Sequence, residues 1–225
     1  MKNKIALVFD FDGTVSPNVM LSLIFDSKGI NEDQFWEYTE TLAEQGYDRE
    51  LSYLKSLCDF CTHKGIKLTN NELREIGSHL KFYPGFPEIL DRLKVEAYAR
   101  GFALEIYVIT AGLQEMVDGS RLGPYLTRCW GCRYGENDEG TISFPMQIVT
   151  SASKVEKLYL IKRQLLEHAY LTHGVFPTLL ERDFNIPPLS ELLAEVQKIK
   201  QIQAKCEAIR ASNVKGSVAL SLIHI

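Results

Sequence analysis

The chain has 225 residues, of which 45% are hydrophobic and 24% are charged, and its formal net charge is −4 at pH 7. This hydrophobic content is enough for a buried core, and the small negative charge argues against nucleic acid or an anionic membrane as a partner. No run of about 20 apolar residues occurs, so we expect no membrane-spanning helix. The first residues carry no apolar segment that ends in a cleavage site, so we expect a cytoplasmic location without a signal peptide.

The first apolar run, residues 4–9, predicts a short strand that is covered on both faces. It ends at Asp10 and Asp12, which are separated by one residue and followed by a turn at Gly13. A buried carboxylate needs a partner or a metal ion, and ligands of open α/β sheets bind at such strand ends. The alternative is a polar strand end that leads into an ordinary turn.

Residues 17–82 then show a helical hydrophobic pattern. One helix is expected to begin at residues 31–33 and a second to cover roughly residues 50–63. A third begins with a capping box, in which the side chains of Thr69 and Glu72 satisfy free backbone donors. The sequence therefore predicts a helical insertion directly after the first strand.

After a break at residues 83–85 and a further amphipathic helix, the β-rich run 104–109 ends at Thr110. Two strands separated by helices predict a parallel sheet of the α/β class. Residues 130–134 and 141–144 flank a polar turn and predict a hairpin. A helix is expected to follow at its C-terminal side.

Two pairs of cysteines have the spacing of metal ligands, Cys58 with Cys61 and Cys129 with Cys132. The pairs lie too far apart in the chain for an ordinary zinc ribbon. The first pair also continues a helical apolar stripe, so we interpret these cysteines as small buried side chains. Disulfides are not expected in a reducing compartment.

Three features that lie far apart in the chain indicate the same protein superfamily. They are the string Asp-Phe-Asp-Gly-Thr at residues 10–14, Thr110 at the end of an apolar strand, and Lys154 at a helix start. In these features the chain resembles the haloacid dehalogenase (HAD) superfamily, and in particular its phosphoserine-phosphatase-like members with a helical cap. The resemblance covers roughly residues 4–162.

The resemblance implies a three-layer, Rossmann-like parallel sheet with a helical cap inserted after the first strand. Residues 1–16 and 83–162 would form this α/β core, and residues 17–82 the cap. Residues 163–225 lie beyond the resemblance, and we expect them to form a helical tail of uncertain origin, with a truncated or artefactual end at residues 220–225.

The implied function is Mg²⁺-dependent hydrolysis of a small phosphorylated metabolite through an aspartyl-phosphate intermediate. Asp10 would be the nucleophile and Asp12 the general acid and base. Thr110, Ala111 and Lys154 would bind the phosphoryl oxygens, and both aspartates would hold the Mg²⁺. Neither nucleic acid nor a membrane is expected as a partner, and the sequence leaves the oligomeric state open.

The fourth acidic motif of that superfamily is missing. After Lys162 the nearest candidates are Glu181 and Asp183, in a run that Pro177 interrupts. The alternative is therefore a degenerate, non-catalytic member that binds phosphate or acts as a scaffold. A further alternative is phosphoryl transfer to an acceptor other than water, which would use the same residues. A frameshift or a chimeric join near Lys162 would also explain why the fourth acidic motif is missing.

Two further elements are expected beyond that point. A long amphipathic helix is predicted to begin at Ser190, and residues 217–225 form an apolar, β-like run.

Overall fold

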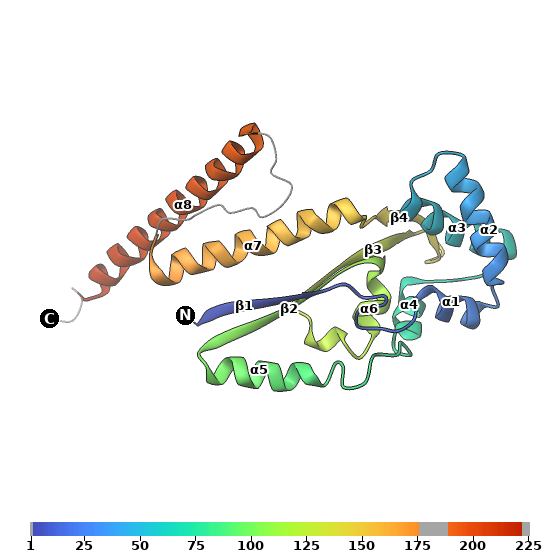
Figure 1. Ribbon diagram of the computed structural model, residues 1–225, viewed down its shortest axis with the longest axis horizontal. Coiled ribbons are helices and arrows are strands. Elements are labelled where there is room, and N and C mark those ends of the chain that lie inside the picture. The colour runs from blue at the N-terminus through green and yellow to red at the C-terminus, as the bar shows by residue number, and fades with distance from the viewer. Residues whose placement is uncertain (1, 176–188, 222–225) are drawn as a thin grey trace. The chain divides into compact units, whose positions relative to one another are not determined.

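The computed structural model describes residues 2–175 and 189–221 (Figure 1). The chain divides into two compact units. The larger one is Ile5–Tyr159, and the smaller one combines Met1–Lys4 with Leu160–Ile225. The larger unit contains every residue of the predicted site, whereas Glu181 and Asp183 lie outside the described residues.

The described chain forms a mixed sheet whose four strands lie in the order β1-β2-β3-β4. They are β1 (Asn3–Phe9), β2 (Phe102–Leu113), β3 (Arg128–Glu136) and β4 (Ile142–Gln147). β2 and β3 pair in parallel, while β3 and β4 form the antiparallel hairpin that the sequence predicted. Helices flank the sheet, and the fold is the three-layer, Rossmann-like α/β class that the sequence predicted (Figure 1). β4 is antiparallel to β3 because a short hairpin turn can join only antiparallel strands.

The helical insertion between β1 and β2 comprises α1 (Leu21–Lys28), α2 (Glu32–Glu44), α3 (Arg49–Lys64) and α4 (Asn70–Gly77), and α5 (Ile89–Ala99) follows it. The capping box of α4 is confirmed. The Thr69 side chain accepts from the Glu72 N–H at 3.0 Å, and the Glu72 carboxylate accepts from the Thr69 N–H at 2.9 Å. These two bonds satisfy backbone donors that the start of a helix leaves free.

The insertion is attached to the core where α4 packs against α6 (Gln114–Gly119), the short helix after β2. Two glycines allow the close approach. A Cβ on Gly77 would lie 2.2 Å from the Met116 carbonyl oxygen, and one on Gly119 would lie 2.1 Å from the Arg74 carbonyl oxygen. Because both obstacles are backbone atoms, neither helix could carry a larger residue at these points without moving.

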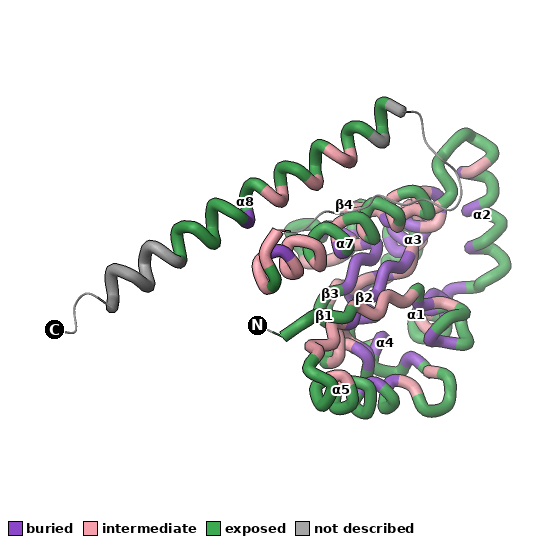
Figure 2. Tube along the Cα trace, turned by 60° about the vertical axis from the view of Figure 1, so that its left-hand side comes forward, coloured by how far each residue is buried: buried purple, intermediate pink, exposed green. Residues whose placement is uncertain are grey.

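The core is centred on β2 and β3, as the buried segments in Figure 2 show. β1 is different, because its pattern runs from exposed to half-buried and Ile5 is 39% exposed. The expectation of a strand covered on both faces is therefore wrong. β1 ends the order of strands in the described sheet, and an apolar run cannot reveal which strands stand beside it.

The five cysteines are free and buried. Burial raises the pKa of Cys58 to about 12 and that of Cys61 to about 11, so both remain neutral thiols at ordinary pH. The interpretation of these cysteines as small buried side chains is confirmed.

The smaller unit contains the end of α7 (Ser151–His173) and the described residues of α8 (Leu189–Ser221). The Gln203 amide donates to the Tyr170 hydroxyl at 3.2 Å, and Arg210 donates to the Leu171 carbonyl at 2.8 Å. The β-like expectation for residues 217–225 is wrong as far as Ser221, because α8 continues to that residue, and 222–225 lie outside the described residues. Among the described residues, no helix has the length and apolar character needed to cross a membrane.

Candidate functional site

A hollow of about 210 Å³ lies where β1 and β2 end, and we refer to it as the aspartate hollow. The side chains that line it include all five residues that the sequence predicted for a site, together with Trp36 and Tyr53 from the helical insertion. The predicted residues are Asp10, Asp12, Thr110, Ala111 and Lys154. Residues far apart in the chain thus converge on one small volume. This is the arrangement expected at strand ends of an α/β sheet.

Asp10 and Lys154 form an ion pair in this hollow. The Lys154 Nζ lies 2.8 Å from Asp10 Oδ2, and Asp10 Oδ1 accepts a hydrogen bond from the Phe11 N–H at 2.8 Å. The Asp10 side chain is 45% exposed and that of Lys154 is 26% exposed, so solvent screens the attraction between them. The Asp10–Lys154 pair therefore adds little to the stability of the fold, and its main effect is to place two opposite charges in the hollow.

The fold makes the Asp12 carboxyl a weaker acid than an ordinary aspartate. The pKa of its carboxyl is raised from 3.8 to about 6, mainly by burial and to a smaller extent by the nearby Asp10 charge. Two groups oppose this shift, the Met20 N–H, which donates to Asp12 Oδ1 at 3.1 Å, and the Lys154 ammonium. A carboxyl with a pKa this close to neutrality can both give and accept a proton at ordinary pH.

The end of β2 forms the opposite wall. The buried Thr110 hydroxyl accepts a hydrogen bond from the Gly112 N–H at 2.9 Å. A Cβ on Gly112 would lie 2.4 Å from Met20 Cε and 3.3 Å from Asp12 Oδ2. Glycine at this position therefore lets the β2 backbone approach both Met20 and the Asp12 carboxylate.

Sequence reasoning did not find Tyr53 and Met20. Tyr53 donates from α3 to the Ala111 carbonyl, and the Met20 thioether accepts from the Leu113 N–H at 2.9 Å. Both contacts depend on how the insertion packs over β2, which no local pattern reveals. Trp36 of α2 is 39% exposed and lines the hollow, whereas Phe35 beside it is fully buried.

Asp10 and Asp12 offer two of the hard oxygen ligands that Mg²⁺ prefers. In the part of the chain that the structure describes, no group of three or more His, Cys, Asp and Glu side chains gathers as a metal site. One Asp10 oxygen is also already paired with Lys154. The donor set is thus suited to a cation that keeps several waters, and Mg²⁺ binding stays a prediction.

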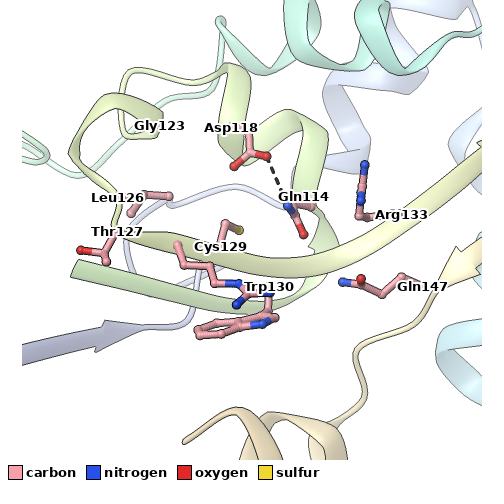
Figure 3. A pocket seen from close by; sticks show the side chains of 10 residues that line it. Gln114, Asp118, Gly123, Leu126, Thr127, Cys129, Trp130, Arg133 and Gln147 are labelled. Atoms are coloured by element: carbon pink, nitrogen blue, oxygen red, sulfur yellow. Dashed lines mark hydrogen bonds between the residues drawn. The ribbon is translucent and has the colours of Figure 1, made fainter. Parts of the chain in front are cut away.

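A second, larger hollow of about 330 Å³ lies between α6 and β3, lined by Gln114, Asp118, Trp130 and Arg133 among others (Figure 3). It shares no lining residue with the aspartate hollow. Two of its charged side chains are already occupied, because Arg133 donates to the buried Glu115 at 2.9 Å and Asp118 accepts from Gln114 at 3.3 Å. The aspartate hollow is therefore the better candidate for chemistry, despite its smaller volume.

Comparison with known proteins shows that part of the chain is similar to a family other than the HAD superfamily. Residues 158–204 match the family model described as RiPP precursor modification enzyme MbnB/TglH/ChrH. This match begins close to the boundary between the two units, at Tyr159 and Leu160.

The curated relatives match over parts of their length. A UPF0276 protein of Shewanella amazonensis is 57% identical over 53 residues, which are 24% of this chain and 18% of the relative. A UPF0276 protein of Pseudomonas aeruginosa is 62% identical over 42 residues, 19% of this chain and 15% of the relative. An uncharacterized protein of Borreliella burgdorferi is 29% identical over 145 residues, 59% of this chain and 50% of the relative. The chain thus spans half or less of these relatives.

Solved structures resemble the fold. A HAD family hydrolase of Salmonella enterica serovar Typhi superposes with a TM-score of 0.53 at 19% identity, over 73% of this chain and 52% of the other. A substrate-bound phosphoserine phosphatase gives a TM-score of 0.51 at 20% identity, over 73% of each chain. At such low identity the likeness shows the fold alone, because one fold carries many functions.

The identification as a HAD-superfamily member is therefore wrong, because the family model and the UPF0276 relatives point to a different family. Phosphomonoester hydrolysis through an aspartyl-phosphate depended on that identification and is wrong with it. The non-catalytic alternative has no support either, since the matching model describes an enzyme of a modification type. The physical reason is that the residues behind the resemblance mark strand ends and a helix start, which reflect a fold shared by many families.

Proposed function

We propose that this protein is an enzyme that transfers a proton through Asp12, to or from a substrate whose negatively charged group lies against Lys154. One observation carries the proposal. The Asp12 carboxyl lines a hollow and has a pKa of about 6, while the carboxylate next to it is already paired with an ammonium group. Pairs of acids whose environments differ in this way are typical of acid–base catalysis.

The charges in the hollow support the division of roles. Lys154 lies 2.8 Å from Asp10 and is 26% exposed, so its remaining donors can reach a ligand. A substrate oxyanion would share this ammonium group with Asp10. The same ammonium lowers the pKa of Asp12, so an anion bound at Lys154 would weaken this effect and favour the protonated form of Asp12. Substrate binding would thus prepare Asp12 to act as an acid.

The matching family model describes modification enzymes of a precursor peptide, and it covers residues 158–204, none of which line the hollow. The hollow, about 210 Å³, is of the size of a side chain or a small metabolite and too small for a whole peptide. We propose an oxyanion-bearing group as substrate, carried on a peptide or on a small metabolite such as a phosphorylated one. A cytoplasmic location and Mg²⁺ as the accompanying cation remain proposals as well.

Binding is tested with Trp36 as a fluorescent reporter, because Trp36 lines the hollow and Trp130 lies outside it. In a Trp130→Phe protein, inorganic phosphate, succinate and a glutamate-rich peptide are titrated separately. Saturable quenching that Lys154→Met weakens about tenfold or more supports the site, and the probe that binds best distinguishes the two sources of the oxyanion. Absence of binding by all three probes would contradict it.

Catalysis is tested by mass. The protein is incubated in D₂O with acidic peptides and small carboxylates, with Asp12→Asn as the comparison. A substrate that gains deuterium, or changes mass in another way, only with the unaltered protein supports the proposal. The absence of any Asp12-dependent mass change would contradict it.

A further inference from the structure

Tyr53 connects the helical insertion to the end of β2. It lies in α3, lines the aspartate hollow and donates a hydrogen bond to the Ala111 carbonyl oxygen. Burial raises its pKa well above 10, and the neighbouring Cys132 contributes to the shift. The phenol therefore keeps its proton and acts as a hydrogen-bond donor over the whole working range of pH.

The Ala111 carbonyl has a second donor on the same side. The Cys132 thiol from β3 lies 3.2 Å from the same oxygen, and its sulfur also accepts from the Val149 N–H at 3.2 Å. Burial raises the pKa of Cys132, so the thiol is protonated and can donate. A phenol and a thiol thus fix the direction of one carbonyl group.

The other half of this peptide unit faces the predicted ligand site. In a trans peptide the Gly112 N–H points opposite to the Ala111 carbonyl. It donates to Thr110 Oγ1 at 2.9 Å. The direction of the Ala111 carbonyl therefore decides whether the Thr110 oxygen receives this hydrogen bond.

The bond that Thr110 accepts determines what its hydroxyl can donate. A hydroxyl has one hydrogen and two acceptor positions. The Gly112 N–H occupies an acceptor position, and no described residue accepts the Thr110 hydrogen. Thr110 is 1% exposed and lines the hollow, so the hydrogen that remains is available to a group bound in the hollow. Hydrogen bonds linked in a chain also polarise one another, which strengthens the final donor.

We propose that Tyr53 is a positioning residue that orients the Thr110 hydroxyl toward a bound oxyanion through the Ala111–Gly112 peptide unit. The inference rests on the proposed function, because it deepens the description of the same hollow. It also gives the helical insertion a role in binding, since the phenol that fixes the β2 end comes from α3.

Phosphate binding to the Trp130→Phe protein provides the test, read from Trp36 fluorescence. Tyr53→Phe is expected to weaken phosphate binding about threefold to tenfold, the range expected for loss of one neutral hydrogen bond. The matched control is Tyr38→Phe, which removes a hydroxyl that donates to Asp59 at 2.7 Å between the helices of the insertion. The control should bind phosphate as the unaltered protein does.

A double-mutant cycle separates positioning from a general structural effect. In a Thr110→Val background, Tyr53→Phe should produce no further loss of binding, because the hydroxyl that it orients is gone. An equal loss in both backgrounds would overturn the inference, and so would unchanged binding in Tyr53→Phe alone. If the unaltered hollow binds neither phosphate nor succinate nor the glutamate-rich peptide, the proposed function fails as well, which is a different result from phosphate binding that does not depend on Tyr53.

Discussion

Lys154 Nζ and Asp10 Oδ2 lie 2.8 Å apart, which joins the start of α7 to the end of β1. The contact matters because it determines the charge that Asp12 experiences. The carboxylate of Asp10 raises the pKa of Asp12, and the ammonium of Lys154 lowers it. Burial is the largest influence, and all influences together give a pKa of about 6. The hollow therefore contains one charged, paired acid and one acid that titrates near neutrality.

The raised pKa of Asp12 should make stability depend on pH. The folded protein holds the Asp12 proton up to about pH 6, whereas the unfolded chain releases it near 3.8. Stability therefore falls as the pH rises between these values and stays lower above them. Asp12→Asn cannot ionise, so it should be more stable than the unaltered protein at pH 8, by up to about 3 kcal/mol. At pH 3.5 the two should be nearly equal.

Thermal unfolding at pH 3.5 and pH 8 measures this difference. Asp33→Asn is the control, because Asp33 lies in the first turn of α2, away from the hollow. An Asp12→Asn protein that is less stable than the unaltered one at pH 8 would contradict the assigned cause.

Mg²⁺ binding should respond to the ion pair. If Asp10 and Asp12 hold the cation, Lys154 competes with it for the Asp10 carboxylate. Lys154→Met should then bind Mg²⁺ more tightly, while Asp10→Asn and Asp12→Asn should each bind it more weakly. Isothermal titration with MgCl₂ measures these affinities. Lys157→Met is the control, because Lys157 pairs with Glu156 on the same helix. Mg²⁺ affinity that is equal in all variants would place any binding elsewhere.

The contact between Gly112 and Met20 predicts a steric effect. In Gly112→Ala the new methyl group would meet the end of the buried Met20 side chain, at 2.4 Å from Cε. We expect a loss of about 1–3 kcal/mol in the free energy of unfolding, as overpacked cores show. Adding Met20→Ala should recover part of it by removing the obstacle, beyond the sum of the single changes. Urea unfolding of the three variants gives the values, and strict additivity would show that the two residues do not meet.

The contact between α4 and α6 should tolerate change even less. Gly77→Ala would place a methyl group 2.2 Å from the Met116 carbonyl oxygen, a backbone atom that cannot rotate away. The two helices must then separate, and we expect a loss of more than about 3 kcal/mol. Ser78→Ala, at an exposed position one residue further, is the control. Urea unfolding of both proteins measures the free energy of unfolding. A Gly77→Ala protein as stable as the control would contradict this packing.

The sequence predicted the parts of the site that come from strand ends and a helix start. Asp10, Asp12 and Thr110 each follow an apolar run, and Lys154 lies in the first turn of a helix, so local pattern was enough to single them out. Parallel strands bring such ends to the same edge of a sheet. The convergence of these residues therefore followed from the fold class.

The residues that sequence reasoning missed come from packing between elements. Tyr53 lies on a helix whose spacing indicates only which face is buried, and its partner is a backbone carbonyl of β2. The exposed edge of β1 could not be foreseen either, because an apolar run looks the same in a central strand and in an edge strand. The family was predicted wrongly for a related reason. The informative match lies in residues 158–204, where the sequence offered an amphipathic pattern and no chemistry.

The pKa of the Asp12 carboxyl decides whether this residue can give and accept a proton near neutral pH. Carbon-13 NMR of labelled aspartate carboxyls, followed from pH 3 to pH 9 in the unaltered protein and in Asp12→Asn, assigns the resonance by its absence from the variant. We expect a midpoint near pH 6 for Asp12. A midpoint at or below the ordinary value of about 4 would contradict it, because Asp12 would then be permanently charged at neutral pH.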